Sequence, residues 1–254
     1  MRRLYITVGV ALLSWSVVLQ AAAPTLGVHG ANSGTTTYTL SPSTLTDGST
    51  LVIGIGQVSG DADQSYSVGD TINTYASAVL SANTGGVSLS RKCQIFYAPN
   101  ISTTAGALTV TITVANGTST SRSQFVEVLG AHLTTPLNAA DSVAESADTM
   151  SHTAAVSMTT DSDIFVYSIM AANSTLGTLT PTASPAFDGT LAADFSVNSV
   201  VSQHYTGATG LTTNTLAWDS GTSRTTASCS AAFIAPAAAD GRAPSLTTLM
   251  ARGR

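Results

Sequence analysis

The sequence predicts an all-β protein, an antiparallel β-sandwich of jelly-roll type with about ten to twelve strands and an N-terminal signal helix. Three observations support this fold class: apolar and hydroxyl residues alternate in short segments, a few segments are apolar throughout, and turn-forming residues separate them. The clearest alternation covers residues 108–114, where Thr109, Thr111 and Thr113 separate apolar neighbours. One face of such a strand packs on a core while the other meets water.

Residues 1–23 have the three-part layout of a secretory signal peptide. Arg2 and Arg3 form a positive start, residues 4–19 are mostly apolar, and residues 21–23 offer a small-residue cleavage site. An uncleaved anchor helix is the alternative, although a membrane span takes about 20 apolar residues. We therefore expect a secreted, cell-surface or virion protein that meets the membrane only through this segment.

Candidate strands then follow one another through most of the chain. Continuous apolar segments at 51–55 and 164–170 are typical of strands that are central or covered on both faces. The other candidate strands are 35–40, 72–79, 87–97, 108–114, 124–129, 152–158, 195–205, 213–218 and 225–235. Residues 24–236 are assigned to one sandwich domain, and residues 237–254 to a disordered tail.

A weak internal repeat suggests two related halves. The residues at 46–49 lead into the first apolar segment, and those at 160–163 lead into the second. Later in each half a turn rich in Thr, Gly and Ala, at 103–106 or 206–210, opens a Thr-rich strand. This order is compatible with paired Greek keys, and Thr-rich low complexity is the alternative origin.

The composition excludes two function classes. The chain has 254 residues, of which 43% are hydrophobic and 9% are charged, with 40 Thr and 33 Ser as its main polar residues. Disorder of the whole chain is excluded, because it requires low hydrophobicity and high net charge. Binding of nucleic acid through charge is also excluded, because a net charge of −5 and a single lysine, Lys92, provide no basic stripe.

Cys93 and Cys229 are the only two cysteines. Alternation places both on the inward faces of their strands, and an exported chain reaches an oxidising compartment. One disulfide is therefore permitted. Two separately buried thiols are the alternative.

Four segments of this chain, 47–54, 68–75, 95–100 and 231–236, occur in an order that resembles a broad group of uncharacterised β-sandwich proteins of secreted bacterial and phage origin. Similar sequences usually carry Asp-x-x-Gly-Asn-Thr-Tyr, whereas this chain has Ile72 in place of the glycine. The resemblance implies a jelly-roll-like fold in an extracellular or virion setting. It implies no catalytic residues.

No complete catalytic motif is found. Trp218, Asp219, Ser220 and Gly221 look like one half of an aspartic protease site, but that chemistry needs a second carboxylate turn, and a tight connection between strands is the simpler interpretation. Glu127 lies in an apolar strand and is the single buried candidate for a glycan hydrolase, which also needs a carboxylate partner.

Two clusters of acidic residues have a spacing that could supply oxygen ligands to a calcium ion. Residues 61–65 place carboxylates at alternate positions, and Asp141, Glu145 and Asp148 would share one face of a helix. Solvated loop charge explains both groups more simply. We expect no metal and no cofactor.

Tyr66, Tyr205 and Trp218 are the candidate glycan contacts, because Tyr66 and Tyr205 adjoin loop-like sequence and Trp218 is the only tryptophan after the signal segment. Tyr97 and Tyr167 are assigned to the core. The leading hypothesis is a non-catalytic extracellular β-sandwich module for surface attachment and for binding a glycan or another partner. The alternatives are a virion or self-assembling structural subunit, which would be a homo-oligomer, and a jelly-roll glycan hydrolase.

Overall fold

A computed structural model of the chain describes residues 24–57, 64–82, 91–103, 108–116, 120–157, 164–172, 180–184, 189–190, 200–207 and 213–236. They belong to a compact unit that spans Ala22–Pro236. The predicted signal peptide and the predicted tail at 237–254 lie outside the described residues. Among the described residues no helix has the length and apolarity needed to cross a membrane.

The predicted all-β, antiparallel fold class is confirmed. The strands are β1 (Thr25–Gly34), β2 (Thr37–Leu40), β3 (Thr50–Gln57), β4 (Ser65–Gly69), β5 (Ala76–Leu80), β6 (Cys93–Ala98), β7 (Val110–Ala115), β8 (Ser121–Leu129), β9 (Leu137–Ser157), β10 (Ile164–Ala172), β11 (Thr180–Ser184), β12 (Gly189–Thr190), β13 (Val200–Gly207) and β14 (Thr213–Ile234). The described residues thus contain four strands that the sequence does not predict: β1, which lacks an alternating pattern, and the short strands β4, β11 and β12.

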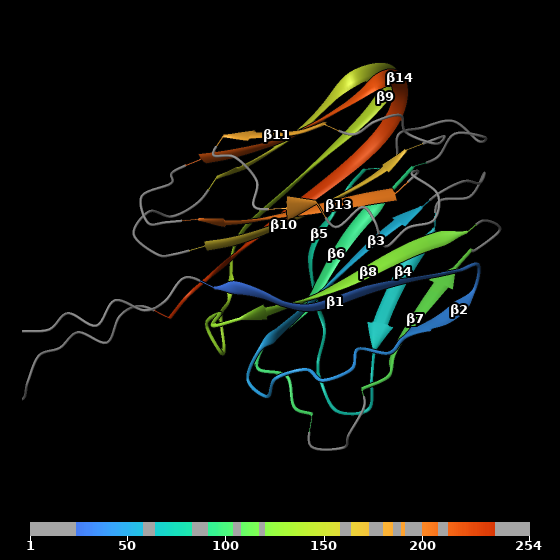
Figure 1. Cartoon of the computed structure of the whole chain (residues 1–254). Helices are drawn as coiled ribbons and strands as arrows, with labels where there is room; N and C mark the ends of the chain where they lie inside the picture. Colours follow the sequence, from blue (N-terminus) through green and yellow to red (C-terminus); the bar gives the residue numbers. More distant parts are fainter. Residues whose placement is uncertain are drawn as a thin grey trace, which may run out of the picture. The chain divides into compact units, whose positions relative to one another are not determined.

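The first eight strands are wound as a jelly roll (Figure 1). β1 pairs with β8, β2 with β7 and β3 with β6, so the first part of the chain runs back beside the second. The pairs β3·β8 and β4·β7 then join these ribbons into two sheets. Sheet A has the order β1-β8-β3-β6-β5, and sheet B has the order β2-β7-β4. This arrangement is the double Greek key of a jelly roll, and we call it the first roll.

Strands β9 to β14 repeat the pairing scheme in sheet C, and we call them the second roll. β9 and β14 pair along most of their length, from Leu137 opposite Phe233 to Ser157 opposite Thr213. β9 thus takes the place of β1 and β2 together, and β14 takes the place of β8 and β7 together. β10 and β11 pair with the other edge of β14, as β3 pairs with β8 and β4 with β7. The repeat agrees with the weak internal repeat in the sequence, although residues 160–163 lie outside the described residues.

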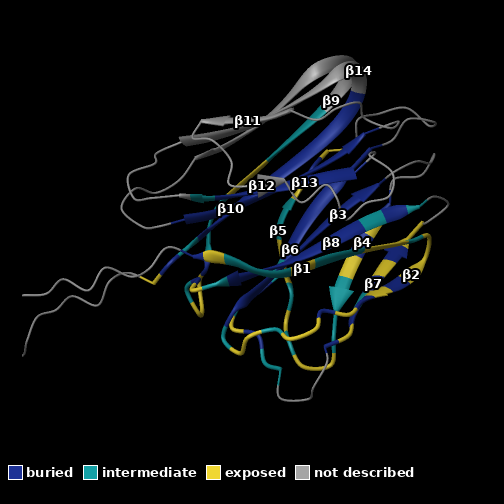
Figure 2. Cartoon of the chain, viewed as in Figure 1, coloured by how far each residue is buried: buried dark blue, intermediate teal, exposed yellow. Residues whose placement is uncertain are grey.

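Sheet A is the middle layer of three (Figure 2). One face packs on sheet B around a core that includes Ile53 and Ile112. The opposite face packs on sheet C around Val52 and Phe165. β3 of sheet A is consequently buried at every position, which explains its mostly apolar sequence. β10 of sheet C is also buried at every position, because Phe165 faces sheet A and Val166 belongs to a separate cluster with Tyr205.

Sheets A and C approach each other closely at Gly54 of β3. A Cβ atom added there would lie 2.7 Å from Cε1 of Tyr167 and 2.9 Å from Cδ1 of Ile169. Only glycine therefore fits at this position without a shift of its neighbours. Tyr167 is fully buried, and its hydroxyl donates to Oε1 of Gln124 at 3.3 Å.

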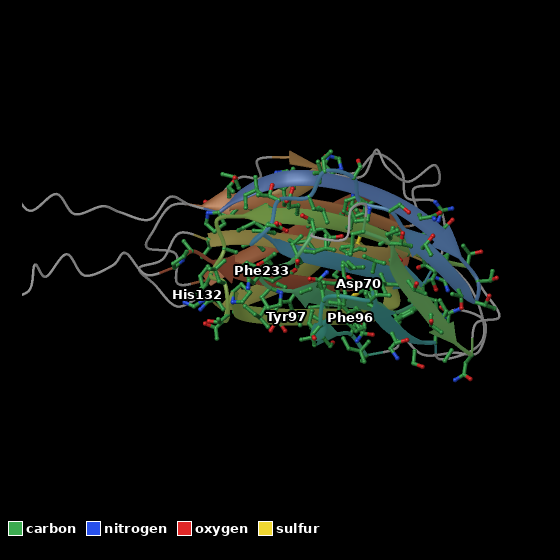
Figure 3. The ribbon with its side chains drawn as sticks, turned by 90° about the horizontal axis from the view of Figure 1, so that it is seen from below. Asp70, Phe96, Tyr97, His132 and Phe233 are labelled. Carbon is green, nitrogen blue, oxygen red and sulfur yellow. A yellow bond between two sulfur atoms is a disulfide. The ribbon has the colours of Figure 1, made fainter. Side chains whose placement is uncertain are left out.

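A disulfide joins Cys93 of β6 to Cys229 of β14 across the same interface, with the two Cα atoms 5.9 Å apart. Both residues are fully buried on the facing sides of sheets A and C. Nearby, the rings of Tyr97 and Phe233 pack edge to face with centroids 5.8 Å apart (Figure 3). The bridge therefore ties the first roll to the second.

One prediction about the last strands is wrong. The sequence predicts separate strands at 213–218 and 225–235 with a tight turn at Asp219, Ser220 and Gly221, whereas the structure has one strand, β14, with register shifts between Asp219 and Thr226. β9 pairs with β14 on both sides of these shifts, so β14 continues through the Ser-Gly pair as one irregular strand.

Candidate ligand-binding groove

The aromatic residues that the sequence predicts as glycan contacts are not brought together. Tyr66 lies in the core between sheets A and B, is 8% exposed, and donates its hydroxyl to Oε1 of Gln64 at 3.0 Å. Tyr205 is also 8% exposed and belongs to a different cluster, in the second roll. The predicted exposure of both rings is therefore wrong. Trp218 lies in β14, but its side chain is outside the described residues.

Glu127 of β8 is a buried structural carboxylate. Its Oε2 accepts a hydrogen bond from the backbone N–H of Val28 at 3.1 Å. Its Oε1 accepts one from the N–H of Thr46 at 2.6 Å and one from the hydroxyl of Ser49 at 3.0 Å. Three donors satisfy this carboxylate without a cation. Glu127 thereby ties β1 to the turn that precedes β3.

The first roll has an opening between β1 and β2. Residues 35–36 connect β1 to β2, but β1 pairs in sheet A and β2 in sheet B, so the two strands diverge beyond the turn. A groove of about 440 Å³ lies between them, and we call it the seam groove. Its described lining residues are Val28, His29, Gly30, Ala31, Asn32, Thr39, Leu40, Ser41, Ser43 and Phe125.

The seam groove combines an apolar floor with a polar, nearly uncharged rim. Leu40 and Phe125 are buried and form the floor. Gly30 makes room for the ring, because a Cβ atom there would lie 2.8 Å from Cε1 of Phe125. The exposed rim residues are His29, Asn32, Thr39, Ser41 and Ser43. Pockets that bind small molecules have this size and this mixture of apolar and hydrogen-bonding groups.

One hydrogen bond holds the two walls of the seam groove together. The side-chain amide of Asn32 on β1 donates to the carbonyl of Thr39 on β2 at 2.7 Å, while the backbone N–H of Ser33 donates to Oδ1 of Asn32 at 2.8 Å. In the second roll β9 runs unbroken through the equivalent position. The described part of that roll therefore has no comparable divergence of strands.

The comparisons with family models, curated proteins and solved structures found no match. The resemblance to secreted and phage-associated β-sandwich proteins thus stays a prediction, and the β-rich fold is what is shown. One segment that carries the resemblance, 68–75, nevertheless has a clear structural role.

Asp70 in that segment closes the connection between β4 and β5 (Figure 3). Its Oδ1 accepts from the N–H groups of Ile72 and Asn73, both at 2.6 Å, and its Oδ2 accepts from the Asn73 amide at 3.0 Å and the Tyr75 hydroxyl at 2.6 Å. Burial alone would raise the pKa of Asp70, but these hydrogen bonds outweigh it and hold that pKa below its ordinary value. Ile72 contributes only its backbone, so a side chain is tolerated there.

Replacing Asp70 by asparagine is expected to destabilise the fold by about 1 kcal/mol near neutral pH, because the amide cannot accept both side-chain donors. The folded-state pKa of Asp70 lies below the unfolded value of about 3.9, so its charge stabilises the folded chain above that pH. This contribution is lost as the pH falls from about 4 through the folded-state pKa. Melting temperatures of wild type and Asp70→Asn should therefore converge in acid, and a constant difference would contradict this assignment.

The described residues contain no group of three or more His, Cys, Asp or Glu side chains that could hold a metal ion. Asp61 and Asp63 of the candidate calcium segment lie outside the described residues. The stretch with Asp141, Glu145 and Asp148 is not helical but belongs to β9. The predicted shared helix face for these three residues is therefore wrong.

Sequence reasoning missed the seam groove because nothing local indicates it. Residues 25–34 are rich in glycine and show no alternation, and the predicted strand begins only at residue 35. The burial of Tyr66, in contrast, could have been found, because Ser65 and Ser67 on either side of it are the exposed positions of an alternating strand.

Proposed function

We propose that this protein is a non-catalytic extracellular module that attaches to a surface by binding a neutral glycan in the seam groove. The observation that carries the proposal is the groove itself, with hydroxyl and amide groups around an apolar floor made by Leu40 and Phe125. Sugars present the same combination of polar edges and apolar faces. His29 is the only ionisable residue among the described lining residues, so a charged ligand would lack a counter-charge.

The hydrogen bonds of Glu127 and Asp70 support binding without turnover. A glycan hydrolase needs two carboxylates that flank the glycosidic bond. Glu127 instead accepts hydrogen bonds from β1 and from the turn before β3, and Asp70 accepts four within its own segment. Both side chains organise the walls and turns of the first roll.

A tryptophan at Ser41 is expected to fill the seam groove and weaken glycan binding about tenfold or more, a loss of about 1.4 kcal/mol. Ser41 is exposed, so the fold should tolerate the substitution. Binding is measured on an array of neutral mono- and disaccharides with residues 24–254. Ala76→Trp, at an exposed position of β5 outside the groove, is the matched control.

The same experiment contradicts the proposal if no neutral sugar binds or if Ser41→Trp binds like the control. Release of shorter sugars would instead favour the hydrolase alternative.

The long edge strand β1 supports the second candidate function, a self-assembling structural subunit, because its ten residues carry no Lys, Arg, Asp or Glu to protect the edge. Assembly that grows with concentration on a sizing column, without any sugar, would favour that function.

A further inference from the structure

A second groove lies on the outer face of sheet B, beside β2, the strand that borders the seam groove. It has a volume of about 400 Å³ and extends along β4 and β7, and we call it the sheet-B groove. The residues that matter for its chemistry are Ser67, Gly69, Thr109, Thr111 and Thr113. Ser67, Thr111 and Thr113 belong to the outward-facing half of the alternating pattern in β4 and β7, and Gly69 occupies the same face of β4.

Strand register connects the two grooves. Thr39, which lines the seam groove, lies directly opposite Thr111, which lines the sheet-B groove. Thr111 in turn lies opposite Gly69 on β4. Opposite residues of antiparallel strands carry side chains about 5 Å apart on the same face. The threonine pair on β2 and β7 therefore links the grooves into one polar track.

A second row of opposing residues crosses sheet B beside the row formed by Thr39, Thr111 and Gly69. Thr37 of β2 lies opposite Thr113 of β7, which lies opposite Ser67 of β4. The two rows are separated by two residues along each strand, roughly 6.7 Å. Hydroxyl groups thus recur in both rows on β2 and β7, and in one row on β4, at Ser67.

Gly69 lines the hollow in this track. No atom lies within 4 Å of a Cβ atom added there, so a side chain at this position would project into open space in the groove. At the end of the groove Asp70 directs its carboxylate to four donors of its own segment. The described lining residues offer a ligand hydroxyl groups and no cation.

We propose that the ligand is an extended neutral polysaccharide, whose chain crosses β2 from the seam groove to the sheet-B groove. This inference rests on the proposed function and adds the length of the ligand and a second contact surface. A compact sugar would occupy only the seam groove. A polymer with a hydroxyl group on every repeating unit matches a track in which polar groups recur at regular steps, and it needs no charged partner.

The test uses an array of neutral oligosaccharides of graded length in the common linkage types. Wild type should bind long oligosaccharides about tenfold more tightly than short ones, because the second surface adds contacts to an already tethered chain. Gly69→Val fills the sheet-B groove at a position where a side chain meets no neighbour. This variant should keep the affinity for short sugars and lose the gain with length, and Ala76→Trp should retain both.

The inference is overturned if the affinity does not depend on the length of the oligosaccharide, or if Gly69→Val still binds long oligosaccharides more tightly than short ones. Either result leaves the proposed function of the seam groove intact. Absence of binding to every neutral glycan overturns the inference and the proposed function together. Binding of an extended peptide to the edge of β2 in place of glycans would likewise overturn both. Melting temperatures of all variants near that of wild type show that the fold is intact.

Discussion

Replacing Cys93 and Cys229 by alanine is expected to lower the free energy of unfolding by about 4 to 5 kcal/mol. The bridge closes a loop between residues that are 136 positions apart in the sequence. Without it the unfolded chain gains the corresponding conformational freedom, so the folded state loses stability relative to it. The position of the bridge adds to this effect, because it holds β6 of the first roll against β14 of the second.

Urea unfolding of the double alanine variant and of wild type at equal pH measures this loss. Reduced wild type serves as the control, because its side chains are retained while the covalent link is removed. A loss below about 1 kcal/mol, within the range of a small truncation of the core, would contradict the role assigned to the bridge. An intermediate with only one folded roll would show as two transitions.

Gly54→Ala is expected to destabilise the protein by about 1 to 3 kcal/mol, although alanine usually suits a strand better than glycine. The added Cβ atom would lie 2.7 Å from Cε1 of Tyr167, in the tightest part of the contact between sheets A and C. Sheet A is covered on both faces, so it has little freedom to move away. The measured quantity is the free energy of unfolding.

A double-mutant cycle with Tyr167→Phe separates this clash from a general effect on β3. The single Tyr167→Phe change loses the hydrogen bond to Gln124, at a cost of about 1 kcal/mol. In the Gly54→Ala background it should cost less, because removing the hydroxyl relieves part of the clash. Gly69→Ala, at a glycine with no neighbour within 4 Å, is the matched control. Additive effects in the cycle would contradict the proposed contact.

The side-chain pattern predicted the interior of the strands well. Thr111 and Thr113 alternate with the buried Val110, Ile112 and Val114 as expected. The two uninterrupted apolar segments became β3 and β10, both buried throughout. These predictions succeed because the direction of a side chain in a strand depends only on its position along that strand.

The candidate site was harder to predict, and each error has a physical cause. Tyr205 adjoins loop-like sequence, but it lies on β13 opposite Val166 and is buried in the second roll. Asp219 looks like a turn residue, but β9 pairs with β14 on both sides of it. In each case a partner strand far away in the sequence overrode the local pattern.

The sequence by itself determined that this chain is all-β and which side of most strands faces a core, because both properties follow from local alternation and turn chemistry. Only the tertiary structure decided which strands pair, that sheet A lies between two others, and that β1 and β2 diverge to leave the seam groove. Pairing depends on the summed packing and hydrogen bonding of distant segments. No short stretch of residues contains that information, so the groove and its link through Thr39 and Thr111 emerge only from the folded chain.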